Sequence, residues 1–545
     1  MRRISSIQAQ ATLKSSCKIQ ELLSSSMEKR VAIIGAGISG LLACKYAASR
    51  GFNPVVFEAE EQVGGLWNHT IESTRLQNIK DFFQFSDFPW PSSVQDAQPT
   101  NTQLLEYLQS YARHFELLPY IKFNSKVVSV SYVGECEEEI QSWELWGGSG
   151  KAFGSKGKWN LKVLHTKEES VEEYAAEFVV ICIGRFSGLP EIPSFPPGFG
   201  PEVFSGKVLH SMDYSAMDNA SAAKFIKGKR IAIIGSGKSA IDIAFECAKA
   251  NGNDIPCTVI QRTIHWMLPH DAQPLGLSFG FLCFSRFAEL LVHKPGEGFL
   301  SSILATSLSP LRWGMSKLIE SYLRWKLPLK KYNMIPKEDV LQEKSSCQIL
   351  FLPPNFYDKV EDGSIILKKS QCFSFCKEGL ILDGEDDPVK ADIVIYATGY
   401  KGDEKLKNIF SSPTFQNCIA GSPTSAIPLY RQMIHPRIPQ LVVISYSESL
   451  SNLYTFEMRC KWLGYFLDEA FKLPSIKKME EDIKMWEKYM KKYSGNGKFR
   501  RACISGVPIW YNDQLCKDIG CNPRRKKGFF TDLFEPYRLA DYKEL

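Results

Sequence analysis

The stretch Val31–Gly40 reads VAIIGAGISG, a short apolar run followed by three glycines in the spacing G-x-G-x-x-G. The apolar run predicts a buried strand over Val31–Ile34, and the residues after the first two glycines have the pattern of a helix over Ser39–Arg50. A second strand is expected over Pro54–Phe57. Strand, glycine turn, helix and strand in this order predict a βαβ unit that binds a dinucleotide.

The residue types in this unit match the chemistry of a dinucleotide. Gly35 permits a tight turn, Gly37 lets a pyrophosphate approach the backbone, and Gly40 lets the helix pack closely on the strand. Glu58 follows the second strand, where a carboxylate accepts hydrogen bonds from ribose hydroxyls and repels a 2′-phosphate. An unphosphorylated adenosine dinucleotide, FAD or NAD, is therefore expected here. The predicted binding residues are Gly35, Ala36, Gly37, Ile38, Ser39, Gly40 and Glu58.

The same order of elements returns in Ile231–Ala240, which reads IAIIGSGKSA. A helix is predicted over Ser239–Ala250 and a strand over Thr258–Gln261. The string Gly-Lys-Ser also occurs in the phosphate-binding loops of NTPases. Such a loop needs a glycine five residues before Gly237, and that position is Ala232, so an NTPase is excluded.

The second unit differs from the first at the end of its second strand. Gln261 stands where the first unit has Glu58, and Arg262 follows it. Loss of the carboxylate and gain of a guanidinium accommodate a 2′-phosphate, so NADPH is expected at this site. The predicted binding residues are Gly235, Ser236, Gly237, Lys238, Ser239, Ala240 and Arg262. Two dinucleotide sites of different preference predict a flavin that NADPH reduces.

The amino-acid composition narrows the possible classes of protein further. The chain has 545 residues, 44% of them hydrophobic and 23% charged, which is typical of a globular protein of several domains and excludes a disordered or collagen-like chain. The net charge of +6 gives no case for nucleic-acid binding. The short basic runs Lys498–Arg501 and Arg524–Lys527 are expected to be solvated surface. No stretch is apolar enough to predict a transmembrane segment; Leu275–Val292 comes nearest and is interpreted as a core or lid segment.

Cysteine usage bears on the compartment. The 15 cysteines include no C-x-x-C pair, which excludes a dithiol reductase, and no cluster with metal-ligand spacing, so no metal site is expected. Free thiols in a reducing, cytoplasmic compartment are the preferred interpretation. Residues 1–26 are rich in serine and basic side chains, like a transit peptide, and import into an organelle stays open beside an unstructured extension.

The repeat of the βαβ unit predicts an α/β fold with two Rossmann-like dinucleotide-binding domains, in which the NADPH domain is inserted into a discontinuous FAD domain. The expected parts are a disordered extension over 1–27, the FAD domain over 28–200 and again over 345–480, the NADPH domain with a helical insertion over 201–344, and a C-terminal helical tail over 481–545.

Four further motifs carry a resemblance to a known family. The pattern F-x-G-x-x-x-H-x-x-x-Y is present as Phe204, Gly206, His210 and Tyr214; the others are Asp392 with Ala397–Tyr400, Gly64–Trp67, and Ser86–Pro89. From Glu28 to about Tyr542 the chain resembles the flavin-containing monooxygenases, which are class B flavoprotein monooxygenases, and among them the plant pathogen-defence type.

The resemblance implies a reaction and further site residues. NADPH would reduce FAD, O2 would add to give a C4a-hydroperoxyflavin, and one oxygen atom would pass to the nitrogen or sulfur of a small-molecule amine or thioether. It implies flavin or nucleotide contacts from Gly65, Leu66, Trp67, Thr398 and Gly399. Gln77 and Asn78 are both candidates for an amide beside the flavin, and His210 is either a nicotinamide-positioning residue or a structural one. The oligomeric state is not implied.

Three alternatives stay open at this point. An NADPH oxidase or reductase that releases peroxide or passes electrons to a partner would share every nucleotide motif. A Baeyer–Villiger-type monooxygenase is disfavoured, because that group carries tryptophan where this chain has Tyr214. A flavin-binding protein without turnover, acting as a sensor or interaction module, is disfavoured because both nucleotide sites are intact.

Overall fold

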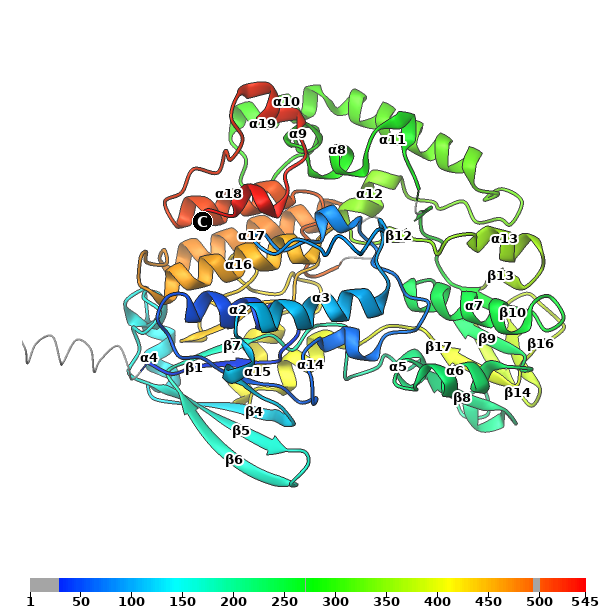
Figure 1. Cartoon of the computed structure of the whole chain (residues 1–545), viewed down its shortest axis with the longest axis horizontal. Helices are drawn as coiled ribbons and strands as arrows, with labels where there is room; N and C mark the ends of the chain where they lie inside the picture. The colour runs from blue at the N-terminus through cyan, green and yellow to red at the C-terminus, as the bar shows by residue number, and fades with distance from the viewer. Residues whose placement is uncertain (1–28, 270, 494–499) are drawn as a thin grey trace, which may run out of the picture.

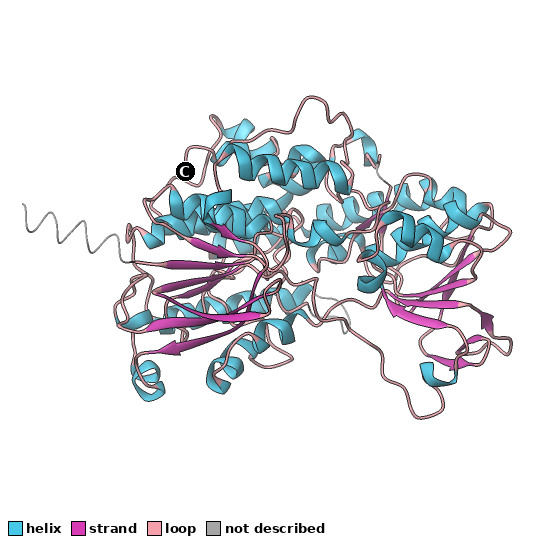
Figure 2. Cartoon of the chain, turned by 60° about the horizontal axis from the view of Figure 1, so that its bottom comes forward, coloured by secondary structure: helices cyan, strands magenta, loops and turns pink. Residues whose placement is uncertain are grey.

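The computed structural model of the chain describes residues 29–269, 271–493 and 500–545. The N-terminal segment 1–27, and with it the question of organelle import, lies outside the described residues. Two parallel sheets form the centres of two α/β units, which Figure 2 shows side by side with helices on their faces. The α/β class with two Rossmann-type domains is confirmed.

The first sheet has five parallel strands in the order β18-β7-β1-β2-β3. Its strands are β1 (Val31–Ile34), β2 (Val55–Phe57), β3 (Ile121–Lys122), β7 (Phe178–Ile181) and β18 (Leu441–Val443). β1 and β7 are buried on both faces, so an uninterrupted apolar run, rather than an alternating one, is the pattern that forms them.

A layer of helices covers this sheet (Figure 1). Helix α2 (Ile38–Ala48) follows the first glycine turn and packs along α16 (Asn452–Leu467), which is buried along almost its whole length. Gly464 permits this close approach, because a Cβ there would lie 3.1 Å from the carbonyl oxygen of Tyr46. The C-terminal part of the chain therefore supports the helix that follows the first glycine turn.

The second sheet has the order β13-β10-β9-β17-β8, and all its neighbouring strands are parallel. Its strands are β8 (Lys207–His210), β9 (Ile231–Ile234), β10 (Cys257–Gln261), β13 (Ile365–Lys369) and β17 (Ile393–Tyr396). The expected return to the first domain at residue 345 is therefore wrong. Strand β17 lies inside the second sheet, between β9 and β8, and this pairing over a long sequence separation leaves no local signal.

The boundaries expected for the second part of the FAD domain (345–480) and for the C-terminal tail (481–545) also differ from those in the structure. The small antiparallel sheet of β14 (Phe373–Cys376), β15 (Gly379–Leu382) and β16 (Val389–Lys390) shares a hydrophobic core with strands of the second sheet. The first sheet receives its remaining strand only at β18. The boundary expected at residue 480 falls inside helix α17 (Ile476–Tyr493), whose buried face makes it part of the core rather than the start of a tail.

The remaining elements complete the two units. A three-stranded antiparallel sheet consists of β4 (Ser125–Val133), β5 (Lys158–His165) and β6 (Ser170–Ala176), and a two-stranded parallel one of β11 (Met267–Leu268) and β12 (Leu350–Phe351). The other helices outside the top of the molecule are α3 (Asn101–His114), α4 (Glu137–Ser142), α5 (Ser211–Ser215), α6 (Asn219–Ile226), α7 (Lys238–Asn251), α13 (Phe356–Glu361), α14 (Gly402–Asn408) and α15 (Pro413–Ala420).

Helices from two distant parts of the sequence meet at the top of Figure 1. They are α8 (Phe279–Phe284), α9 (Arg286–Leu290), α10 (Phe299–Ser307), α11 (Ser309–Lys326) and α12 (Val340–Ser345) from the insertion, and α18 (Pro508–Asp518) and α19 (Phe529–Phe534) from the C-terminus. Among the helices of the described residues, none combines the length and apolarity needed to cross a membrane.

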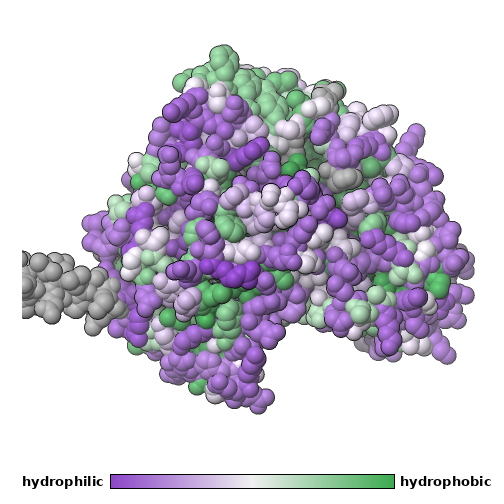
Figure 3. All heavy atoms as spheres, viewed as in Figure 1, coloured by the Kyte–Doolittle hydropathy of each residue, from purple (hydrophilic) through white to green (hydrophobic). Residues whose placement is uncertain are grey.

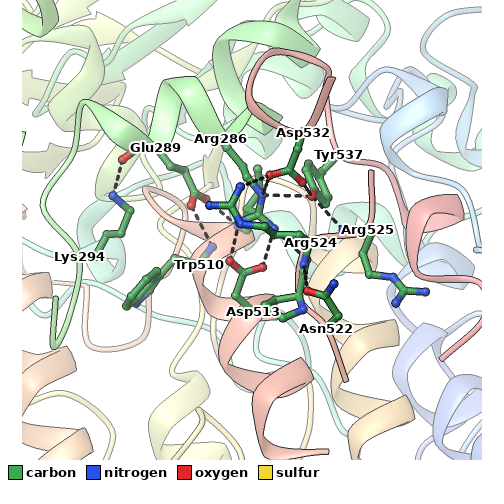
Figure 4. Close-up of polar contacts among 12 residues, drawn as sticks. Arg286, Glu289, Lys294, Trp510, Asp513, Asn522, Arg524, Arg525, Asp532 and Tyr537 are labelled. Atoms are coloured by element: carbon green, nitrogen blue, oxygen red, sulfur yellow. Dashed lines mark hydrogen bonds and ion pairs between the residues drawn. The ribbon is translucent and has the colours of Figure 1, made fainter. Parts of the chain in front are cut away.

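A buried polar cluster ties these two parts together (Figure 4). Arg286 of α9 forms two hydrogen bonds with the carboxylate of Asp513 on α18, at 2.6 and 2.9 Å. Glu289 of α9 accepts the backbone N–H groups of Ile509, at 2.6 Å, and Trp510, at 2.9 Å, in the first turn of α18. Burial raises the pKa of Glu289 to about 7.

Cys347 and Cys503 form a disulfide, which links the insertion to the segment before α18. The expectation of free thiols throughout the chain is wrong for this pair. The two cysteines are far apart in sequence, and the fold brings them together at the junction between α12 and the C-terminal region. The other twelve cysteines of the described residues are free.

We expect Glu289 to make stability depend on pH. Its pKa is about 7 in the folded chain against an ordinary value of 4.5, so the folded state retains a proton that the unfolded state releases. The stabilisation is complete below pH 4.5 and is lost as the pH rises through 7. Between pH 5 and pH 8 the free energy of unfolding should fall by about 2–3 kcal/mol more in the parent protein than in Glu289→Gln.

Denaturant unfolding of both proteins across this pH range measures the difference. Glu535→Gln, at an exposed position, is the matched control and should follow the parent. Parallel pH profiles for the parent and Glu289→Gln would contradict the buried, protonated carboxyl.

Candidate nucleotide-binding and active site

The first glycine turn lies at the carboxyl end of β1, as expected. Gly35 has a φ of +101°, and a Cβ there would lie 2.8 Å from the carbonyl oxygen of Cys182. A Cβ on Gly40 would lie 1.8 Å from the carbonyl oxygen of Gly35, so only glycine lets α2 pack this closely on the turn. Gly37 is the N-cap of α2 and has no side chain to cap it, which leaves N–H groups of Ile38 and Ser39 at the helix start for a phosphate.

The Gly64–Gly65 turn, also in the first unit, approaches the first glycine turn. A Cβ on Gly65 would lie 3.0 Å from the Cα of Gly37, and Gly65 has a φ of +57°. Gly65 opens the short 3₁₀ helix Gly65–His69, in which Trp67 packs against the core and Leu66 is exposed. The backbones of the two turns thus form a cradle without side chains, a shape that fits a pyrophosphate. The expected contacts of Gly65, Leu66 and Trp67 remain proposals.

Glu58 is buried at the end of β2 and fixed to the turn. One carboxylate oxygen accepts the N–H of Ala36 at 2.5 Å, and the other accepts the N–H of Glu60 at 3.0 Å. Burial is the main cause of the raised pKa of this carboxyl. The side chain therefore holds the shape of the turn and presents its remaining lone pairs where the sequence places ribose hydroxyls.

The second glycine turn repeats this geometry at the end of β9. Gly235 has a φ of +148°, and a Cβ there would lie 2.3 Å from the carbonyl oxygen of Ala397, just after β17. Gly237 is the N-cap of α7, and a Cβ there would meet no atom within 4 Å. Open space therefore lies over the start of α7, with the backbone of Ser236, Ser239 and Ala240 around it, and a phosphate group fits it.

Gln261 is the last residue of β10, and Arg262 follows it. Gln261 is fully buried, and neither its amide oxygen nor its amide nitrogen has a hydrogen-bond partner among the described residues. Arg262 is exposed, and in the described part of the chain its guanidinium pairs with no carboxylate. An unengaged guanidinium at the strand end has the chemistry that a 2′-phosphate needs.

Lys238 is engaged elsewhere. Its ammonium donates to Asp242 at 2.6 Å, one turn along α7. The side chain is therefore turned back along the helix, unlike the lysine of an NTPase loop, so only the backbone of Lys238 is offered to a nucleotide.

Helix α7 also binds a segment of the first unit. Asp242 accepts a hydrogen bond from the hydroxyl of Thr74 at 2.5 Å, and Glu246 accepts the N–H of Ser73 at 2.8 Å and the hydroxyl of Tyr214 at 2.7 Å. We call these contacts the α7 clamp. It connects the two units directly behind the second glycine turn.

His210 ends β8 next to the turn that follows β17. Its Nδ1 accepts the N–H of Met212 at 3.1 Å, and its ring meets Tyr400 edge-on at 5.4 Å. Its Nε2 is buried next to the backbone of Gly399 and makes no hydrogen bond of standard geometry in the described residues. Burial lowers the pKa of the imidazole, so the neutral form is favoured. Thr398 donates to the carbonyl of Glu191, and the carbonyl of Gly399 accepts the N–H of the same residue at 2.9 Å. Thr398 and Gly399 thus join the second sheet to the chain that arrives from the first.

Gln77 and Asn78 lie in the segment after the α7 clamp. The Nδ2 of Asn78, which is buried, donates to the carbonyl of Leu450 at 2.9 Å, just before α16. The Oε1 of Gln77 accepts the N–H of Phe351 in β12 at 3.5 Å, a weak contact. The structure therefore brings both amides to the junction of three chain segments, and both stay candidates.

Two features of the site were missed in the sequence. Cys182-Ile183-Gly184 after β7 is the counterpart of Ala397-Thr398-Gly399 after β17, and Gly184 and Gly399 both have positive φ values. Lys405 of α14 donates to the carbonyl of Ile183 at 2.8 Å and the hydroxyl of Ser187 at 2.9 Å. Burial lowers the pKa of Lys405 to about 8. The sequence carries a signal for the first feature, because both buried strands are followed by a similar tripeptide that ends in glycine. It carries no signal for the role of Lys405.

Two glycine turns of this type on neighbouring parallel sheets define a flavoprotein oxidoreductase with two dinucleotide sites. The family model described as flavin-binding monooxygenase-like matches residues 28–536. The chain belongs to this family. The expected class of enzyme, a flavin monooxygenase with FAD and NADPH as cofactors, is thereby confirmed.

Curated relatives extend over most of the chain. The probable flavin-containing monooxygenase 1 of Arabidopsis thaliana is 41% identical over 519 residues, which cover 94% of this chain and 96% of the relative. The dimethylaniline monooxygenase [N-oxide-forming] 2 of Cavia porcellus is 29% identical over 518 residues, 91% of this chain and 84% of the relative.

Solved structures share the fold. The S-allyl-L-cysteine S-oxygenase of Allium sativum has a TM-score of 0.54 at 19% identity, and the match covers 91% of this chain and 89% of that one. An oxidised steroid monooxygenase bound to NADP has a TM-score of 0.62 at 16% identity, with 91% and 98% covered.

Filling each cradle should remove one nucleotide and leave the other. Gly37 and Gly237 have φ values of −73° and −87°, so a valine acts there by its volume rather than by backbone strain. We expect Gly37→Val to purify without FAD. We expect Gly237→Val to keep its FAD and to raise the KM for NADPH about tenfold or more.

Flavin absorbance per chain and steady-state kinetics measure the two effects, and each variant is the control for the other. Equal flavin loss in both variants would mean that the glycines support folding rather than two separate sites.

Proposed function

We propose that this chain oxygenates a soft nitrogen or sulfur atom of a small molecule, with NADPH as the reductant and O2 as the oxidant. The observation that carries the proposal is the contrast between the two nucleotide turns. The first ends at the buried carboxylate of Glu58, and the second at the exposed guanidinium of Arg262, which no carboxylate of the described residues pairs. Bound FAD supplies the redox and oxygen-transfer chemistry, so the protein needs no nucleophilic triad or metal.

The chain's own residues would bind and orient. The N–H groups at the starts of α2 and α7 would hold the two pyrophosphates, and Glu58 and Arg262 would select the adenosine halves. The carbonyl of Cys182 packs against Gly35 in the first turn, and the carbonyl of Ala397 packs against Gly235 in the second. These assignments rest on the positions of the residues beside the glycine turns.

Two groups are proposed to act nearer the reacting atoms. Asn78 is tethered by one N–H to the carbonyl of Leu450, which leaves its second N–H to donate to a polar oxygen species. Gln77 is held only weakly and is the second candidate. The neutral imidazole of His210, whose Nε2 is buried beside Gly399, would position the nicotinamide.

The relatives support nitrogen or sulfur as the target. One curated relative is named as an N-oxide-forming dimethylaniline monooxygenase, and one fold neighbour as an S-oxygenase of S-allyl-L-cysteine. Both act on a lone pair rather than on a carbonyl carbon. A tertiary or secondary amine and a thioether are therefore the first substrate classes to test.

Product analysis tests the proposal. NADPH consumption is measured with amines, amino acids and thioethers, together with the mass of each product and the peroxide released. We expect at least one soft nucleophile to gain one oxygen atom and to lower the peroxide formed per NADPH. Peroxide equal to NADPH with every candidate would make the chain an oxidase, and a ketone converted to an ester would make it a Baeyer–Villiger enzyme.

Removal of the guanidinium tests the nucleotide preference. A charge-assisted contact with a phosphate is worth about 1.5–3 kcal/mol, so Arg262→Ala should lower kcat/KM for NADPH about 10- to 150-fold. Use of NADH, which lacks the 2′-phosphate, should be nearly unchanged. Arg113→Ala, at an exposed position of α3, is the matched control and should leave both nucleotides unaffected. Equal losses for both nucleotides would mean that Arg262 supports the fold.

A further inference from the structure

Lys405 of α14 is a half-buried cation that forms an ion pair with no carboxylate of the described residues. Its ammonium donates instead to uncharged oxygens, the carbonyl of Ile183 at 2.8 Å and the hydroxyl of Ser187 at 2.9 Å, and the carbonyl of Gly184 lies 3.5 Å away. A charge removed from water needs a counter-charge. An unpaired, half-buried ammonium therefore indicates a place where an anionic ligand can complete the pairing.

The loop that Lys405 holds packs against the first glycine turn. The carbonyl oxygen of Cys182, one residue before Ile183, would lie 2.8 Å from a Cβ on Gly35, and the Cβ of Cys182 would lie 3.7 Å from a Cβ on Gly40. The hydrogen bond from Lys405 therefore acts on the residue that directly follows this contact. An ammonium that fixes Ile183 also fixes the surface on which the first glycine turn rests.

The charges around Lys405 connect it to the same site. The carboxylate of Glu58, at the end of β2, attracts the ammonium, and Lys126 of β4 repels it. In the loop itself, Arg185 is already paired with Asp403 of α14 at 3.0 Å. Burial lowers the pKa of Lys405 to about 8. The ammonium therefore lies near the first turn with only part of the negative charge that it can pair.

Helix α14 has other contacts that keep it in place. A Cβ on Gly402 would lie 2.4 Å from the Cγ of Arg185 and 2.7 Å from its carbonyl oxygen, so the start of the helix is pressed onto the loop. Asp403 pairs with Arg185 at 3.0 Å and with Arg501 at 2.9 Å. A methionine in place of Lys405 would keep the aliphatic stem. The positive charge can therefore be removed while the packing of α14 is retained.

We propose that Lys405 is a positioning residue for FAD, whose ammonium fixes the loop after β7 against the first glycine turn and supplies positive charge to the anionic dinucleotide bound there. The inference rests on the FAD site of the proposed function. The pyrophosphate of FAD is anionic, and none of the residues Gly35–Gly40 carries a cationic side chain. The turn offers backbone N–H groups and the carboxylate of Glu58. A cation held beside the turn by Ile183 and Ser187 balances the charge of the bound cofactor.

The pH dependence of FAD affinity tests the role of the charge. The ammonium form of Lys405 dominates below pH 8 and is lost as the pH rises through its pKa of about 8, so FAD should bind most tightly below pH 8. Between pH 7 and pH 9 the Kd for FAD should rise about five- to tenfold. Free and bound flavin are measured after ultrafiltration of the diluted full-length holoenzyme. Neither NADPH nor a substrate is present, so oxygenation does not enter this measurement.

Two substitutions separate the charge from the shape of the side chain. Lys405→Met should raise the Kd at pH 7 about tenfold or more, because charge-assisted hydrogen bonds are lost, and should remove the pH dependence. Lys405→Arg stays charged at every pH of the series, so its Kd should be the same at pH 9 as at pH 7. A lysine that only supports the fold would raise the Kd in both variants and leave the pH dependence of the parent in place.

Matched controls complete the experiment. Lys407→Met removes a lysine two positions further along α14, on a different side of the helix, and should keep the Kd and the pH dependence of the parent. Phe530→Ser should do the same, because it changes only an exposed side chain of α19, the helix that Figure 1 places at the apolar upper edge of the molecule seen in Figure 3.

The possible outcomes are distinct. A parent Kd that stays constant from pH 7 to pH 9, or a Lys405→Met variant that binds FAD like the parent, overturns the inference and leaves the proposed function as it stands. A parent protein that binds no FAD overturns the proposed function and this inference together.

Discussion

The arrangement of the two units depends on a buried carboxylate, Asp242 in helix α7. It is 0% exposed, and a charge removed from water in this way must be paired. Lys238 supplies the pairing from the same helix and Thr74 from the other unit. Loss of Lys238 would leave the buried charge uncompensated, and loss of the Thr74 hydroxyl would leave one of its oxygens without this donor. This pairing therefore fixes where the segment with Ser73 and Thr74 packs against α7, the helix that starts at the proposed NADPH site.

The same clamp gives the family motif a physical explanation. Gly206 lets β8 begin against β17, because a Cβ there would lie 2.4 Å from the carbonyl oxygen of Asp392. His210 ends β8 beside Tyr400, and Tyr214, one helical turn further on, donates to Glu246. The motif thus joins the edge strand β8 of the second sheet, the turn after the neighbouring strand β17 and the α7 clamp. Its residues position the two units, and His210 is the member whose ring nitrogen lies buried beside the turn after β17.

Local features were predictable from the sequence and pairings over long separations were not. The strand expected over Val31–Ile34 has these bounds in the structure, and both glycine turns have the predicted form, because each depends on a few neighbouring residues. Strand β17 was placed in the wrong unit, because an apolar run does not specify which sheet it joins. The disulfide partner of Cys347 and the carbonyls that bind Lys405 are likewise set by the fold alone.

The two nucleotide turns differ in a way that matches a resident cofactor and an exchanging one. The first turn is closed: Gly40 packs on Gly35, and the Gly64–Gly65 turn contacts it at Gly37. The second turn is open, with alanine at the third position and free space over Gly237. The N–H of Gly64 donates to the carbonyl of Ala36 at 3.2 Å, so the backbone at the proposed FAD site is fixed by two turns, whereas a Cβ on Gly237 would meet no atom within 4 Å. We infer that the closed turn retains FAD through many reaction cycles and that the open turn admits and releases NADPH in each of them.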